Sequence, residues 1–449
     1  MSIQSFRRTM MLAASVTTFS LLFGCGGGGG GGGGGSSEPS TWSGTKQLGV
    51  AGVSTDGVAI ATDASGNVLV AGTTSGGLDG NTLAGFYDVF LTKYSSSGAK
   101  KFTRQLGVSG GQAVGYGVAV DGSNNVYVVG QSSGNLDGQA QQGTYDAFLI
   151  KYNSSGTKQF TKLTGVSGAE TRATAVAVDS SNNLYVVGYT AGGLDGNTSA
   201  GHTDVFVTKY NSSGVKQFTK QFGVSGSNTE GTAVALDSSG NVYVVGDTMA
   251  GLNGQTQTGE YDLFLLKLDS SGNTVFTRQM GSTSGRVMPK AVAIDGSGRV
   301  NVAGTTTGDF DGHTLVGSRD TFLVQFNSSG TKQFSAVLGV TGFQAINAGA
   351  AVDSSGNVYL AGYTSGGLDG NSLTGSEDAF LAKFDSSGTK QFTMQLGVVG
   401  VITRGYAVAV NKSSEVFITG RTSGGLDGNT VTGSEDAFVT KYSSAGVKQ

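Results

Sequence analysis

The chain has 449 residues, of which 78 are glycine and 2 are proline, and only 13% are charged. Abundant glycine with almost no proline, in a chain that is 37% hydrophobic, excludes collagen and argues against disorder. It is typical of a fold with many tight turns, because glycine adopts positive φ without steric cost. The formal charge is −3 and no cluster of lysine or arginine stands out, so nucleic acid is not expected as a partner.

Residues 1–24 have the features of a lipoprotein signal peptide. Arg7 and Arg8 precede an apolar run that is too short for a transmembrane helix. The run ends in Leu-Leu-Phe-Gly-Cys at residues 21–25, which resembles the lipobox of bacterial lipoproteins. The resemblance implies cleavage before Cys25 and attachment of lipid to its thiol; the alternative is ordinary signal cleavage beside an incidental cysteine. Because the chain has 1 cysteine, it forms no intramolecular disulfide.

Residues 25–40 are expected to form the lipidated cysteine and a flexible tether, since an unbroken run of glycine occupies residues 26–35. The residue after Cys25 is glycine, and it lacks the aspartate that resembles an inner-membrane retention signal. We therefore expect a lipid-anchored protein of the bacterial cell envelope, at the outer membrane or cell surface.

One unit of 58 residues is repeated through the rest of the chain, residues 41–449. The tripeptide Gln47-Leu48-Gly49 returns as Gln105-Leu106-Gly107 and, with some substitution, in five further copies at the same spacing. The seven repeats are residues 47–104, 105–162, 163–220, 221–278, 279–336, 337–394 and 395–449. No insertion or deletion interrupts them, so each copy is expected to occupy an equivalent place.

The sequence pattern predicts four short strands within each repeat. In the third copy they are residues 174–178, 184–188, 204–210 and 215–220, separated by Asn-, Ser- and Gly-rich turns, and no helical period is present. Four antiparallel strands repeated radially predict an all-β fold, a seven-bladed β-propeller. Consecutive apolar residues in the middle strands indicate that both sheet faces are covered, as they are when blades stack.

The ring is expected to be closed by an N-terminal strand. The seventh repeat stops at Gln449, where its fourth strand should begin. Residues 42–48 match the missing strand and precede the first full blade, so they are predicted to complete the last one.

Three motifs recur in the repeats: the Leu-Asp-Gly-Asn loop at residues 78–81, the strand at residues 88–94 and the Ser-Ser-Gly turn at residues 96–98. Through these motifs the unit resembles the bacterial SBBP-type β-propeller repeat, and the resemblance extends over residues 47–449. It implies a propeller on a cell-surface protein and carries no catalytic residue with it.

Two aspartates recur in the repeat, at the positions of Asp79 and Asp88. Aspartate in a glycine-rich loop is a ligand type for Ca²⁺, so this pair is a weak calcium candidate. The spacing differs from that of an EF-hand loop, however, and the favoured interpretation is structural. Asp79 would form an Asp-Gly turn, and Asp88 would accept hydrogen bonds from backbone amides of the loop. No other cofactor is expected.

The residues that break the repeat are the better guide to a binding site. They concentrate in the loops that join the fourth strand of one blade to the first strand of the next, on the same face as the Leu-Asp-Gly-Asn loops. The candidate binding residues there are Arg172, Glu230, Arg286, Lys290 and Arg404.

No constellation of catalytic residues is apparent in the sequence. The expected function is therefore a non-enzymatic binding or scaffold module for a protein or glycan, acting as a monomer. The alternatives are a structural spacer of the envelope, and a glycan-acting lyase or hydrolase at the mouth of the ring.

Overall fold

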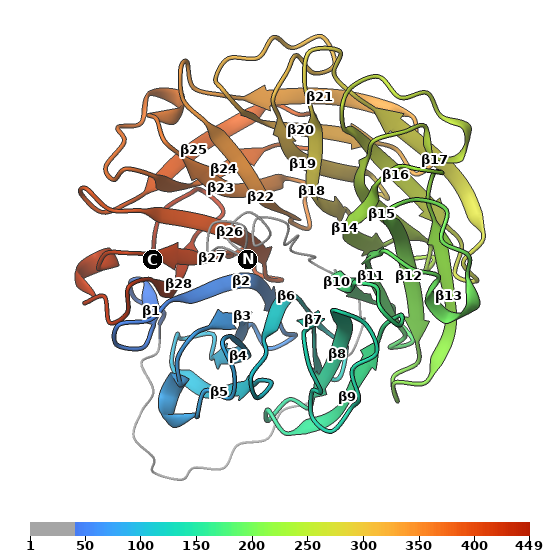
Figure 1. Ribbon diagram of the computed structural model, residues 1–449. Helices are drawn as coiled ribbons and strands as arrows, with labels where there is room; N and C mark the ends of the chain where they lie inside the picture. The colour runs from blue at the N-terminus through green and yellow to red at the C-terminus, as the bar shows by residue number, and fades with distance from the viewer. Residues whose placement is uncertain (1–40) are drawn as a thin grey trace, which may run out of the picture.

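The computed structural model describes residues 41–449. The signal peptide at residues 1–24, Cys25 and the tether to residue 40 lie outside the described residues. Seven four-stranded antiparallel sheets surround a common axis, as predicted, and form a seven-bladed propeller (Figure 1). No helix within residues 41–449 is long and apolar enough to cross a membrane.

The blades follow one another along the chain with the same strand lengths. The first blade is β2 (Thr55–Thr62), β3 (Val68–Thr74), β4 (Asp88–Tyr94) and β5 (Lys100–Leu106); the second is β6 (Ala113–Val120), β7 (Val126–Ser132), β8 (Asp146–Tyr152) and β9 (Lys158–Thr164). The third is β10 (Thr171–Val178), β11 (Leu184–Thr190), β12 (Asp204–Tyr210) and β13 (Lys216–Phe222); the fourth is β14 (Thr229–Leu236), β15 (Val242–Thr248), β16 (Asp262–Leu268) and β17 (Thr274–Met280). The fifth is β18 (Val287–Ile294), β19 (Val300–Thr306), β20 (Asp320–Phe326) and β21 (Lys332–Leu338); the sixth is β22 (Ala345–Val352), β23 (Val358–Thr364), β24 (Asp378–Phe384) and β25 (Lys390–Leu396). The seventh is β26 (Thr403–Val410), β27 (Val416–Thr422), β28 (Asp436–Tyr442) and β1 (Lys46–Leu48).

The first strand of each blade begins earlier than the sequence pattern predicted. In the third blade β10 starts at Thr171 instead of residue 174, because Thr171 and Arg172 pair with Thr190 and Tyr189 of β11. A β-bulge between Ala173 and Ala175 separates this short segment from the rest of the strand. The bulge recurs in all seven blades and interrupts the regular alternation of side chains along the strand.

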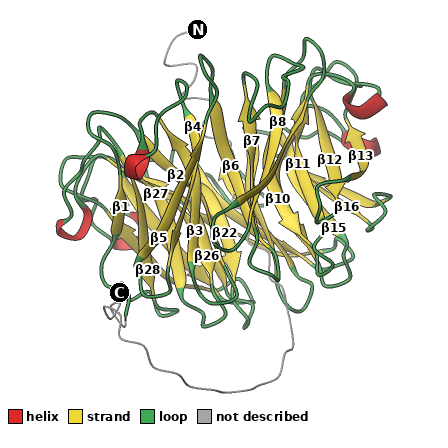
Figure 2. Ribbon diagram, turned by 90° about the horizontal axis from the view of Figure 1, so that it is seen from below, coloured by secondary structure: helices red, strands yellow, loops and turns green. Residues whose placement is uncertain are grey.

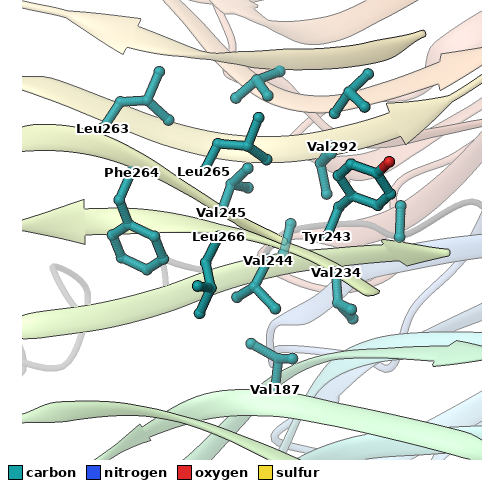
Figure 3. Close-up of a cluster of buried hydrophobic side chains, with 14 of the residues drawn as sticks. Val187, Val234, Tyr243, Val244, Val245, Leu263, Phe264, Leu265, Leu266 and Val292 are labelled. Carbon is teal, nitrogen blue, oxygen red and sulfur yellow. The ribbon is translucent and has the colours of Figure 1, made fainter. Parts of the chain in front are cut away.

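The apolar core lies between the blades. Val244 and Val245 of β15 and Leu265 of β16 are fully buried, and they belong to a cluster that extends from β10 to β20 (Figure 3). Neighbouring residues of one strand point to opposite sheet faces, so each blade contributes to two interfaces. The fourth strands carry lysine and glutamine, and they form the exposed outer edge of each blade.

Loops occupy both ends of the strands, seen from the side in Figure 2. We call loop face the side that carries the loops between second and third strands and the connections from one blade to the next. The turn face carries the two short hairpin turns of each blade, such as residues 63–67 and 95–99. Antiparallel pairing places these two sets of connections on opposite faces.

Backbone hydrogen bonds join consecutive blades on the loop face. The amide at the start of each first strand donates to the carbonyl group just before the third strand of the preceding blade, as Ala113 does to Tyr87 at 2.8 Å. All seven junctions have this bond, including the closing one, in which Thr55 donates to Glu435 at 2.9 Å.

The N-terminal strand closes the ring, as predicted. Residues Lys46–Leu48 pair with β28, with Gln47 opposite Phe438. The C-terminal Lys448 and Gln449 continue the same outer edge, since Gln449 donates to the carbonyl of Lys441 at 2.9 Å. Asp427 holds both the N-terminal and the C-terminal segment, because it accepts hydrogen bonds from the Thr45 amide at 3.0 Å and from Lys448.

Trp42 substitutes for a phenylalanine that the seventh blade lacks. In the other blades a phenylalanine of the fourth strand packs against a turn glycine of the next blade, as Phe102 does against Gly156. At the closing junction the Trp42 ring lies against Gly98 in this way. Trp42 is 4% exposed and makes edge-on contacts with Phe417 at 5.4 Å and Tyr94 at 6.2 Å. The ring therefore belongs to the interface between the last blade and the first.

Trp42→Ala should destabilise the propeller by about 3–5 kcal/mol, because it leaves a cavity where the first and last blades meet. The measurement is chemical unfolding of the purified chain. Ser43→Ala, an exposed neighbour, should leave the midpoint unchanged. A Trp42→Ala midpoint equal to that of wild type would contradict the closure.

Candidate functional site

The second recurring aspartate holds the loop that precedes the third strand. The Asp88 carboxylate accepts hydrogen bonds from the amides of Ala84 at 2.9 Å and Gly85 at 3.2 Å, and from the Gln105 side chain at 2.9 Å. A Cβ atom at Gly107 would lie 1.7 Å from the Asp88 carboxylate. This aspartate therefore has the predicted structural role, and it also explains why Gln-Leu-Gly recurs.

The first recurring aspartate ties its loop to the outer strand. Asp79 has φ +51 and Gly80 has φ +81, so the pair makes the expected Asp-Gly turn. The Asp79 carboxylate accepts hydrogen bonds from Lys100 and Thr103 of β5. The fourth blade has Asn253 at the aspartate position and Thr274 at the lysine position, so both partners of the ion pair change together.

Metal-ligating side chains do not gather in threes anywhere in residues 41–449. Calcium binding by the loop of Asp79 and Asp88 remains a prediction.

The residues that break the repeat meet at the loop-face ends of the two inner strands of each blade. We call this ring of paired positions the axial rim. On the first strands it consists of Asp56, Val114, Arg172, Glu230, Met288, Ile346 and Arg404. Their partners on the second strands are Thr73, Gln131, Tyr189, Asp247, Thr305, Tyr363 and Arg421. No two blades have the same pair, although the strands that carry them are nearly identical in length and register.

Blade 7 contributes a basic pair to the axial rim. Arg404 lies directly opposite Arg421 in the sheet. Arg404 is paired with Glu377 of the preceding blade, and its guanidinium lies 4.8 Å from the centre of the Tyr363 ring. Arg421 contacts Glu435 at 2.9 Å and Asp56 of the next blade at 3.5 Å. Carboxylates from both neighbouring blades thus surround the two arginines.

Blade 4 contributes an acidic pair at the same register. Glu230 lies directly opposite Asp247, and Lys290 of the next blade lies close to both. Burial, together with the negative charge of Asp247, raises the pKa of Glu230 to about 7, and burial raises the pKa of Asp247 to about 6. Burial also lowers the pKa of Lys290, against the opposing effect of the two carboxylates. Perturbed groups of this kind are typical of functional sites.

Arg172 of blade 3 lies beside two aromatic rings. It pairs with Glu170 at 3.0 Å, and its guanidinium lies 5.1 Å from the Tyr145 ring and 5.7 Å from the Tyr189 ring. Its Nε atom is buried and has no hydrogen-bond partner among the described residues. Part of this guanidinium is therefore held in place by stacking instead of hydrogen bonds.

The structure places four of the five predicted binding residues on the inner strands. Arg172, Glu230, Lys290 and Arg404 lie in first strands, so their assignment to loops was wrong. Arg172, Glu230 and Arg404 pair with the second strands before the bulge, which extends the sheet toward the loop face, whereas Lys290 lies in the bulge of β18. Arg286 precedes β18, is exposed and is paired with Glu260, and its guanidinium lies 4.8 Å from the centre of the Tyr261 ring.

The sequence search missed Asp56, Asp247 and Arg421. Asp247 and Arg421 lie in second strands, where the search for variable loops did not extend. A signal was present: the positions equivalent to Thr73 hold a different residue in most copies, within strands that otherwise repeat.

Four stretches of the chain, residues 44–79, 101–137, 159–195 and 217–253, match the family model described as SBBP, a beta-propeller repeat. These four stretches of the chain are SBBP β-propeller repeats. The 58-residue spacing that carries the four matches continues through the remaining three repeats to the end of the chain.

A curated relative is the Regulatory protein FlaEY of Caulobacter vibrioides, which is 28% identical over 373 residues. The match covers 72% of this chain and 38% of the relative, so the SBBP propeller spans well under half the length of that protein. Similar solved structures include a chain of the mitotic checkpoint complex, with 14% identity and a TM-score of 0.48 over 94% of this chain and 98% of that one. An ulvan lyase bound to its saccharide has 12% identity and a TM-score of 0.48 over 90% and 98% of the two chains.

Replacing Glu230 by glutamine should stabilise the SBBP propeller in a pH-dependent way. The folded-state pKa is raised, so wild type loses stability as the pH rises from about 4.5 to about 7 and the buried carboxylate ionises. Glu230→Gln should therefore have a higher melting temperature than wild type at pH 8, and the difference should vanish at pH 4. Glu260→Gln, an exposed change on the same face, is the control. Equal shifts at pH 4 and pH 8 would contradict a raised pKa.

Proposed function

We propose that the chain is a non-enzymatic binding module whose axial rim contacts a protein or glycan partner. The observation that carries the proposal is the placement of like charges at one register of the rim. Arg404 faces Arg421 in blade 7 and Glu230 faces Asp247 in blade 4, on opposite sides of the ring (Figure 1).

Packing alone does not favour these pairs. Like charges directly opposite each other in neighbouring strands are destabilising. The fifth blade has Met288 and Thr305 at the same positions, so an uncharged pair fits this scaffold. A spacer would have no need of the charged pairs. A surface that recognises a partner uses such asymmetry, because charge complementarity sets specificity and orientation.

The relative supports a role other than catalysis, since it is named a regulatory protein. We further propose that the module is anchored in the bacterial cell envelope by lipid on Cys25. Two or three acyl chains are enough to hold a folded domain at a membrane stably.

A second candidate is an enzyme that hydrolyses or cleaves a glycan. The paired carboxylates of Glu230 and Asp247 favour it, because glycoside hydrolysis uses one carboxyl group that stays protonated near neutral pH and one that is ionised. Release of reducing ends from envelope polysaccharide, lost in Asp247→Asn, would support this candidate over simple binding.

Neutralising the arginine pair should weaken capture of the partner. The full chain is used as bait against solubilised envelope fractions and on a glycan array. Arg404→Gln with Arg421→Gln should reduce the amount captured at a given concentration by about tenfold, because arginine anchors contribute strongly to interfaces. Lys412→Gln, at an exposed turn-face position, is the matched control and should bind as wild type does. Unchanged capture by the folded double variant would show that the partner does not use the arginine pair of the rim.

Cys25→Ser should abolish attachment of lipid. Wild-type chain expressed in bacteria that are fed an alkyne fatty acid should become labelled and should sediment with membranes. The variant should be unlabelled and released from the membrane fraction. Labelling of the variant would place the lipid elsewhere.

A further inference from the structure

Three ionisable side chains from two neighbouring blades lie close together on the acidic side of the axial rim. Glu230 of β14 and Asp247 of β15 are directly paired, so their side chains project from the same sheet face with Cβ atoms about 5 Å apart. Strand β18 packs against both of these strands and brings Lys290 to them. Lys290 lies in the bulge between Pro289 and Ala291. At a bulge the side chains no longer alternate regularly between the two faces of the sheet. We call these residues the acid–lysine site.

The side chains of the acid–lysine site are unpaired. Within residues 41–449, no hydrogen bond and no ion pair within 4.0 Å is formed by the side chain of Glu230, Asp247 or Lys290. Asp247 is nevertheless only 8% exposed. Other buried aspartates of the scaffold are saturated, as Asp121 is by the amides of Ser123 and Asn125 and by the Tyr127 hydroxyl.

A buried polar group without a hydrogen-bond partner is costly, and the Asp247 carboxylate belongs to a buried side chain with no such partner. The three side chains thus have hydrogen-bonding capacity that the fold itself does not use. A ligand that supplies both donors and acceptors would satisfy it.

The two carboxylates and the one ammonium group of the site indicate which chemical group the ligand should present. An anion would face two carboxylates, and an ammonium group would face Lys290. A hydroxyl group meets both demands, because it donates to a carboxylate and accepts from an ammonium group. Two adjacent hydroxyls would serve two carboxylates and the lysine together. Resting on the binding function proposed above, we propose that the acid–lysine site binds the vicinal hydroxyl groups of a neutral sugar residue.

Two tyrosines lie in the electrostatic surroundings of the site. Burial raises the pKa values of Tyr189 and Tyr261, and the negative charge of Glu230 adds to this effect for both, as does that of Asp247 for Tyr261. Tyr261 is half-buried. Aromatic faces beside a few polar groups are the usual surroundings of a ligand with both apolar C–H and polar O–H surfaces.

The test is direct binding of neutral oligosaccharides to the full chain. An array of neutral hexose oligosaccharides is compared with matched uronate-bearing and sulfated ones, and the best neutral probe is then titrated calorimetrically. Glu230→Gln and Asp247→Asn, which keep the shape, should each weaken binding by about tenfold, because an amide is a poorer acceptor than a carboxylate. Glu415→Gln, in the pair with Lys441 on the turn face, should bind as wild type does.

The pH dependence separates a binding role from a structural one. Glu230 is faced by Asp247 on β15, by Lys290 on β18, and by Arg172 and Glu170 of the third blade. Because the ionised carboxylate is the better acceptor, binding of the neutral probe should strengthen by about tenfold from pH 5.5 to pH 8. Glu230→Gln should lose the part of this dependence that lies near pH 7 and keep the part that lies near pH 6, where Asp247 ionises, while remaining folded by melting temperature.

Two outcomes would overturn the proposal. The first is preference for uronate-bearing or sulfated probes, which would assign recognition to the arginine pair instead. The second is absence of binding to every neutral probe while envelope fractions still yield a partner that requires Arg404 and Arg421. In that second case the proposed binding function stands, but its ligand is not a neutral sugar. If neither a neutral probe nor a partner from envelope fractions binds, the proposed function is wrong as well.

Discussion

The hydrogen bond between consecutive blades on the loop face is the constraint on which the rest of the structure depends. It joins an amide at the start of a first strand to a carbonyl just before a third strand, and it recurs at every junction of the ring. The loop before the third strand must therefore reach the same point in each blade. Asp88 and its equivalents hold that loop, and the adjoining Gly85 sits so close to the next blade that a Cβ atom there would lie 2.2 Å from a backbone oxygen. An insertion in this loop would break the contact, which explains why the length of the loop is the same in every repeat.

The same constraint separates scaffold from site. Side chains that hold the interface are repeated because each junction needs them. The axial rim lies beside the junction bonds but does not take part in them, so its side chains are free to differ. Blades 4 and 7 use that freedom to place an acidic pair and a basic pair at one register. The basic pair is neutralised by Glu377, Glu435 and Asp56, whereas the acidic pair has only Lys290 and the more distant Arg172 beside it. The two sides of the ring therefore differ in how completely their charges are satisfied.

Much of the fold could be predicted from the sequence, because strands such as residues 204–210 have the same apolar pattern in every copy. The closing strand was predictable for the same reason. The role of Trp42 was not, since alignment of the repeats places Gly44 at the position of Phe102 and the aromatic ring comes from two residues earlier. The pairing of Glu230 with Asp247 was hidden too. It depends on the register of two strands across a bulge, and nothing local in the sequence records that register.

The direction in which β1 runs determines how the molecule can be attached. Leu48, at the end of β1, pairs with Ala437 near the loop face, while Trp42 lies against Gly98 in a hairpin turn of the opposite face. The chain thus enters the ring from the turn face, at its outer edge. A linkage through residues before Trp42 would pull on that edge and leave the axial rim pointing away from the surface that bears the linkage. Partners arriving from solution would then meet the variable residues first.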